Sequence, residues 1–149
     1  MSELRDLYQE VILDHNKHPH NFGELAGADR HADGFNPLCG DKLAVYVNLH
    51  GDTITDVRFE GSGCAISKAS ASLMTDSVKG KTLAETRELF NRFLNLVTDG
   101  DVADDGEALG KLAVFAGVRD YPTRVKCASL AWHTLRAAVE DRRDVVTTE

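Results

Sequence analysis

One stretch of the sequence constrains the fold more than any other: an alternating pattern that begins at Asp41. Apolar side chains occupy every second position, as in a strand with one buried face, at Leu43, Val45, Val47 and Leu49. The tetrapeptide HGDT follows, and a second run carries Ile54, Val57 and Phe59. The pattern predicts an antiparallel β-hairpin, and its apolar face must be covered by other elements.

Five segments have the periodicity or end signals of helices that could cover that face: residues 2–17, 66–79, 82–98, 107–118 and 123–143. The third begins with TLAE, a capping box. We predict a further strand at 31–35, a surface loop at 98–107 and a fraying tail at 144–149. The expected fold is α+β, a small antiparallel sheet of about three strands with helices packed on one face.

Length and charge narrow the class of protein. A chain of 149 residues predicts a single domain, 1–149, able to bury roughly 70% of its unfolded surface without disulfides. A formal charge of −7, with scattered Lys and Arg, disfavours a nucleic-acid partner. No apolar run approaches the roughly 20 residues that cross a bilayer, and the amino terminus lacks a secretory pattern. We expect a cytoplasmic protein without a membrane partner.

Three cysteines lie at the ends of predicted elements. Cys39 and Asp41 lead into the first hairpin strand, Cys64 separates the second strand from a helix, and Cys127 falls in the first turns of the last helix. Helix starts favour thiolates. If these ends converge, three thiolates and one carboxylate provide the sulfur-rich shell that zinc prefers. The chain has no Cys-x-x-Cys pair, so buried structural thiols stay open as an alternative.

The histidines are interpreted as lying outside that site. The run DHNKHPHNF holds His15, His18 and His20, which we read as a solvated surface loop. His31 could support the site from the strand before Cys39. His133, beside Trp132, is expected to pack in the interior.

Four blocks of the sequence resemble the IscU-like family of iron–sulfur cluster assembly proteins, and more closely its SufU branch: LYQEVILDHNKHPHNFGEL, NPLCGDKL, FEGSGCAISKASASLMTDSVKGK and RVKCASLAWHTL. The resemblance runs from about residue 4 to about residue 138. Two features favour the SufU branch. The chain carries the insertion ALGKLAVFAGVRDYPTR, and Lys126 precedes the last cysteine where the scaffold branch has a histidine.

The resemblance implies a zinc ion on Cys39, Asp41, Cys64 and Cys127, and sulfur accepted from a pyridoxal-phosphate cysteine desulfurase of the SufS type. A partner histidine would replace Cys39 on the metal during docking, and the sulfur would pass toward a Suf scaffold. We assign Cys39 as the acceptor, because its Gly-flanked loop can move. Arg124 and Lys126, within one turn of Cys127, would offset the negative charge of the site.

Two other functions use the same four residues. The protein could be a scaffold that builds and hands on a transient iron–sulfur cluster, with Asp41 as the fourth ligand. It could also be a non-catalytic zinc module whose metal only stabilises an interaction domain.

Overall fold

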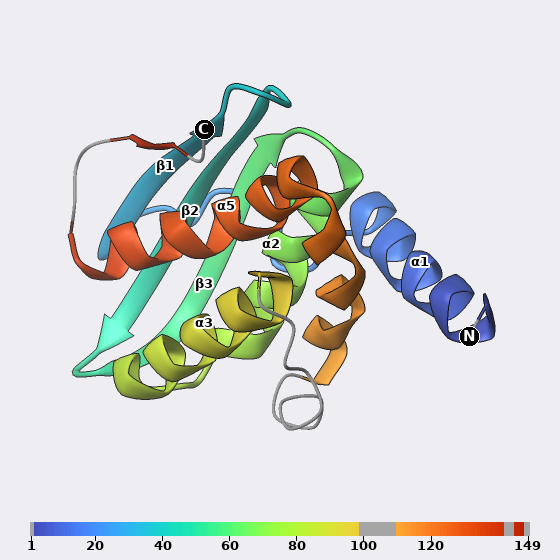
Figure 1. The fold of residues 1–149 in the computed structure, drawn as a ribbon. Coiled ribbons are helices and arrows are strands. Elements are labelled where there is room, and N and C mark those ends of the chain that lie inside the picture. Colours follow the sequence, from blue (N-terminus) through green and yellow to red (C-terminus); the bar gives the residue numbers. More distant parts are fainter. Residues whose placement is uncertain (1, 99–109, 142–144, 148–149) are drawn as a thin grey trace.

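The computed structural model describes residues 2–98, 110–141 and 145–147, with the side chains of 9–98, 110–115, 118, 121–141 and 145–147. Its elements follow one another along the chain as shown in Figure 1. They are α1 (Ser2–Lys17), β1 (Arg30–Asn36), β2 (Asp41–His50), β3 (Thr53–Ser62), α2 (Ala65–Val78), α3 (Leu83–Thr98), the 3-10 helix η1 (Gly110–Asp120), α5 (Pro122–Val139) and β4 (Val146–Thr147).

The sheet has the strand order β3-β2-β1-β4. The predicted hairpin is the antiparallel β2–β3 pair, and β1 pairs antiparallel with β2 on the other side. The expected fraying of the tail is wrong for Val146 and Thr147, which pair in parallel with Gly34 and Phe35. The tail covers an edge of β1 that would otherwise expose its backbone groups. The α+β prediction is confirmed, with this fourth strand making the sheet mixed.

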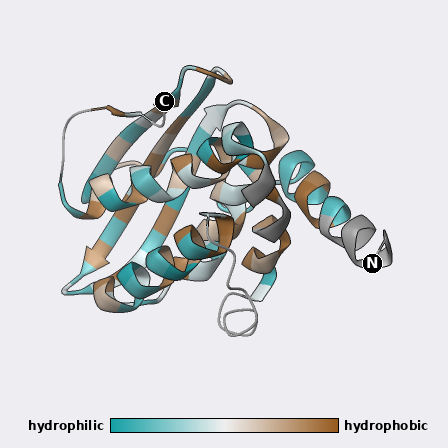
Figure 2. Cartoon of the chain, viewed as in Figure 1, coloured by the Kyte–Doolittle hydropathy of each residue, from teal (hydrophilic) through white to brown (hydrophobic). Residues whose placement is uncertain are grey.

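The helices lie on one face of the sheet (Figure 1). Apolar and polar residues alternate along the strands, as Figure 2 shows, and the apolar set of β2 is buried beneath the helices. A register shift after Asn48 leaves Thr55 without an opposing residue. This β-bulge explains why Ile54 and Val57 are three residues apart and yet both fully buried.

The helix predictions hold to different degrees. The capping box before α3 is confirmed, because Thr82 N–H donates to Glu85 Oε1 (3.0 Å) and Glu85 N–H donates to Thr82 Oγ1 (3.1 Å). The last helix is shorter than predicted and ends at Val139, before Asp141 takes a left-handed conformation (φ +57°). Positions 99–107 of the predicted loop lie outside the described residues. No helix in the described ranges is both long and apolar enough to cross a bilayer.

An aromatic cluster joins α3, η1 and α5 in the core. Phe93 is fully buried, stacks on Trp132 with ring centroids 4.7 Å apart, and meets the edge of Phe115 at 5.8 Å. Each of the three helices thus contributes one ring to the junction, and the rings pack against one another there.

Replacing Phe93 with alanine is expected to lower the free energy of unfolding by about 3–5 kcal/mol, because it leaves a cavity at this junction. Phe22→Ala is the matched control, since Phe22 is 44% exposed and meets only the edge of Phe59 among the aromatic rings of the described residues. Urea unfolding of both variants measures the difference. Equal losses would contradict the central role of the cluster.

Candidate metal centre

The turn between β1 and β2 carries the first two residues of the centre. Asn36 and Asp41 are opposite each other in the β1–β2 ladder, and Gly40 N–H donates to the carbonyl of Asn36 (2.8 Å). Gly40 has φ +72°, a conformation that side chains disfavour. The turn leaves Cys39 exposed, whereas Asp41 points to the core face of β2 and is fully buried.

Cys64 lies at the start of α2 and caps it. Its sulfur accepts the N–H of Ser67 (3.4 Å), and its own N–H donates to Asp41 Oδ1 (2.7 Å). Gly63, at φ +155°, permits this close approach, because a Cβ there would lie 2.3 Å from Asp41 Oδ1. The absence of a side chain at Gly63 thus allows the start of α2 to approach β2 closely.

Cys127 reaches the same place from α5. It is 2% exposed, and its thiol donates to the sulfur of Cys39 across 3.1 Å. The buried side chain of Asn36 donates to Cys127 Sγ (3.5 Å) and accepts the N–H of Leu38 (3.2 Å). Sequence reasoning missed Asn36, although its place before Pro37 is a turn signal.

The structure brings three of the four predicted ligands to within metal-binding distance of one another. Ligand atoms of Cys39, Asp41 and Cys127 all lie within 4.8 Å of one another. Cys64 is outside this group of three, but its Sγ lies 3.7 Å from Asp41 Oδ2 and it lines the same pocket as Cys39 and Cys127. Three thiols and one carboxylate, drawn from a turn, a strand and two helices, form a donor set that suits zinc.

The thiols influence one another's protonation. The neighbouring Cys127 thiol lowers the pKa of Cys64 to about 7, with a smaller contribution from the Ser67 N–H, while burial opposes the shift. The neighbouring Cys64 raises the pKa of Cys127 well above its ordinary value, and burial adds to the rise.

The centre opens to the surface through a pocket of about 440 Å³. Besides the three cysteines, its lining includes Tyr121 and Arg124, and the Arg124 guanidinium lies over the Tyr121 ring, 4.5 Å from its centroid. Lys126 is half-buried on α5 and does not line the pocket. Of the two predicted neighbouring cations, Arg124 is the one at the pocket.

The predictions for three of the histidines can be compared with their positions in the structure. His31 hydrogen-bonds to Asp33 and stacks on Tyr46, so its expected support of the centre is wrong. His133 meets the edge of Phe90, in agreement with an interior role. The interpretation of His15 as part of a solvated loop is wrong: it lies in α1 and is 3% exposed.

Residues 7–128 match the family model described as NifU-like N terminal domain. The chain belongs to this family. Within it, the chain is 41% identical over 138 residues to the zinc-dependent sulfurtransferase SufU of Bacillus subtilis (strain 168), covering 93% of this chain and 92% of that protein. It is 40% identical over 140 residues to the iron–sulfur cluster assembly scaffold protein IscU of Streptococcus pyogenes serotype M1, covering 94% and 87%.

Solved structures of NifU-like relatives share the fold. FiSufU of Fervidobacterium islandicum AW-1 superposes with a TM-score of 0.82 at 38% identity, covering 87% of this chain and 94% of that one. The amino-terminal part of a NifU-like protein from Brucella abortus gives 0.82 at 27% identity, covering 92% and 94%. The resemblance to the IscU-like family and its SufU branch is confirmed, and with it membership of an iron–sulfur cluster assembly family.

Gly63→Ala is expected to weaken zinc binding at least tenfold, because the new Cβ pushes the Asp41 carboxylate away from Cys64. Gly51→Ala is the control, since Gly51 also has a positive φ (+61°) but has nothing within 4 Å of an added Cβ. Both variants should lose about 1 kcal/mol or more of stability from backbone strain. Competition with a chromophoric chelator measures the zinc affinity, and a normal affinity in Gly63→Ala would refute the packing argument.

Proposed function

We propose that this protein is a zinc-dependent sulfur acceptor, which takes persulfide sulfur from a pyridoxal-phosphate cysteine desulfurase for iron–sulfur cluster assembly. One observation carries the proposal: an exposed thiol, Cys39, lies among the ligand atoms of Asp41 and Cys127. The name of the Bacillus subtilis relative supports the same function.

The donor set fits a zinc ion held by Cys39, Asp41, Cys64 and Cys127. When bound, zinc would keep the thiols deprotonated near neutral pH and restrain their reactivity until the donor docks. Three thiolates and a carboxylate around a divalent ion leave a net charge of about −2, which favours a nearby cation. Arg124 on the pocket lining supplies one.

Cys39 is the acceptor in this proposal, because it combines exposure with a position in a turn. Cys64 and Cys127 are fixed by helices, one as the cap of α2 and the other as a buried residue of α5. A thiol that must meet a second protein has to be at the surface, and Cys39 satisfies that condition.

The transfer is a thiolate–persulfide exchange. The Cys39 thiolate attacks the outer sulfur of the persulfide carried by the desulfurase cysteine, and a sulfur–sulfur bond forms at Cys39. The bond within the donor persulfide breaks, and its electron pair leaves with the donor cysteine as a thiolate. No further oxidant or reductant is needed.

The partner in this proposal is a desulfurase of the SufS type, with a Suf scaffold as the later recipient of the sulfur, in the cytoplasm. Two exposed side chains lie beside the centre. Leu38, which is 60% exposed, precedes Cys39 in the sequence, and Tyr121, which is 52% exposed, lines the pocket. Exposed apolar side chains beside a reactive thiol suit contact with another protein.

A scaffold role is the second candidate, because the Streptococcus pyogenes relative is named as one. The same three thiols and Asp41 could hold an iron–sulfur cluster as cargo. The two roles differ in what the protein retains after the reaction: a persulfide on one cysteine, or iron and sulfide together.

Cys39→Ala is expected to bring the alanine production of the desulfurase down to the rate of the desulfurase alone, because the acceptor sulfur is gone. Zinc should stay largely bound through the other three residues. Cys64→Ala and Cys127→Ala should instead release zinc and lower the melting temperature. Full activation by Cys39→Ala would assign the acceptor role to another residue.

Asp41→Ala separates the acceptor from the scaffold. A sulfur acceptor should lose zinc affinity and gain no cluster, whereas a scaffold should trap a cluster that the wild type releases. Anaerobic reconstitution with iron and sulfide, followed by visible absorption and iron analysis of both proteins, is the measurement. A stable cluster on Asp41→Ala would favour the scaffold.

A further inference from the structure

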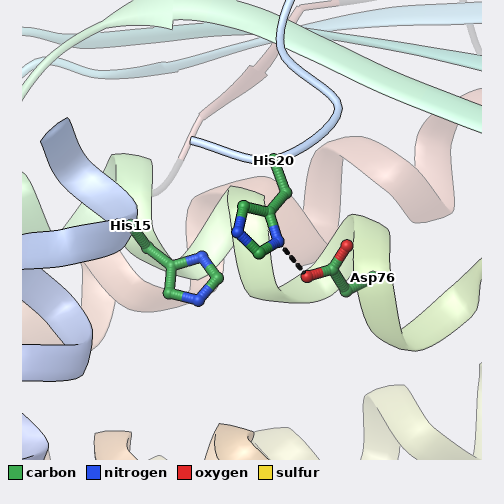
Figure 3. Close-up of side chains that lie close together, drawn as sticks. All are labelled: His15, His20 and Asp76. Atoms are coloured by element: carbon green, nitrogen blue, oxygen red, sulfur yellow. Dashed lines mark hydrogen bonds and ion pairs between the residues drawn. The ribbon is translucent and has the colours of Figure 1, made fainter. Parts of the chain in front are cut away.

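A second cluster of metal-type donors lies where α1 meets α2, away from the cysteines. It consists of His15 from α1, His20 from the segment after it, and Asp76 from α2. Each offers one ligand atom, and these atoms lie within 4.8 Å of one another. Figure 3 shows the His20 ring between the His15 ring and the Asp76 carboxylate. The fold brings His20 and Asp76 together across 56 positions of the chain.

We propose that His15, His20 and Asp76 form a second metal site, which binds a zinc-like divalent cation. Two imidazole nitrogens and one carboxylate oxygen are donors of borderline character, suited to zinc, cobalt or nickel rather than to calcium or magnesium. Three protein ligands leave a coordination position for water. The proposal does not depend on the cysteine centre.

Neighbouring groups hold the three side chains in place, as outer partners do in metal sites. The Ser72 hydroxyl lies 2.7 Å from His15 Nδ1 and accepts the backbone N–H of His20, also at 2.7 Å. One serine therefore positions both histidines. Asn21 donates to Asp76 Oδ1 (3.1 Å), while Oδ2 faces His20 Nδ1 (2.5 Å).

The protonation of the cluster also suits a cation. Burial lowers the pKa of His15, and the neighbouring His20 lowers it further, so the His15 ring is neutral near pH 7 and keeps a lone pair. His20 Nδ1 and Asp76 Oδ2 already face each other in a hydrogen bond. A metal ion bound between these two atoms would take the place of that hydrogen bond.

Some of the charges around the cluster favour a bound cation and others oppose it. The cluster lies at the carboxyl end of α1, where free carbonyl groups attract cations. Asp14 adds negative charge near His15, and Lys111 of η1 adds positive charge. The two carboxylates and the helix end favour a bound cation, whereas Lys111, and Lys17 in the same turn as His15, oppose one.

A metal here would fasten α1 to the rest of the protein. In Figure 1 α1 extends away from the sheet, and its contacts are with α2 and η1. Its described apolar residues Val11 and Ile12 are only partly buried against the core. A metal–ligand link between His15 and Asp76 would add to this packing, and metal binding should stabilise the protein.

The test compares cobalt binding by the wild-type chain and by His20→Arg. Arginine can keep an ion pair with Asp76 but cannot bind a metal, since it stays protonated. The wild type is expected to bind one more cobalt per chain than His20→Arg. This extra cobalt should give weak visible bands without the thiolate charge-transfer absorption of a cysteine site. Zinc beyond the first equivalent should raise the melting temperature of the wild type only.

His18→Ala is the matched control, because His18 is an exposed histidine of the same segment outside the cluster. It should bind cobalt as the wild type does. Equal cobalt stoichiometry in the wild type and His20→Arg would overturn the proposal and leave the cluster as an ion pair. Loss of the extra cobalt in His18→Ala would also overturn it, since binding would then be a property of exposed histidines in general.

Discussion

A single buried carboxylate, Asp41, connects the parts on which this structure depends. It is the first residue of β2, lies on the core face of the sheet and is fully buried. Burying a carboxylate costs several kcal/mol unless hydrogen bonds compensate. Here the N–H of Cys64 donates to Oδ1 at 2.7 Å, at the amino end of α2 where the helix favours negative charge. The start of β2 is thereby fixed against the helix that Cys64 caps.

The sequence predicts the part of the fold that depends on local pattern. The β2–β3 hairpin is readable because one face of each strand is apolar, and the start of α3 because Thr82 and Glu85 cap it reciprocally. The strand β4 is not readable, since its two residues have no pattern of their own and pair only because β1 offers a free edge. The bulge at Thr55 is likewise a property of the pair of strands rather than of one.

The candidate site can likewise be predicted from the sequence only where a local pattern places a residue. Spacing alone leaves the three cysteines open to interpretation as buried thiols, because their meeting depends on how α2 and α5 pack. Asp41 carries a local signal, since it continues the every-second-residue register of Leu43 and Val45 and so places an acid on the apolar face. His15 carries a similar one: it follows Val11 and Ile12 at helical spacing, which predicts a buried position.

Helix α2 relates the cysteine centre to the histidine cluster. Cys64 caps its amino end, and Ser72 and Asp76 lie in its last turns. Its small buried residues let neighbouring helices approach closely, and Ser70 donates to the carbonyl of Ala128, next to Cys127, at 2.6 Å. A shift of α2 would therefore move Cys64 and Cys127 together.

Cys39 differs from the other three residues of the centre, because its backbone belongs to a turn rather than to a helix or strand. Helix packing fixes Cys64 and Cys127, and the sheet fixes Asp41. A change in the turn alters the position of the Cys39 sulfur without disturbing that packing. The fold thus divides the centre into three residues positioned by α2, α5 and β2 and one exposed thiol positioned by a turn.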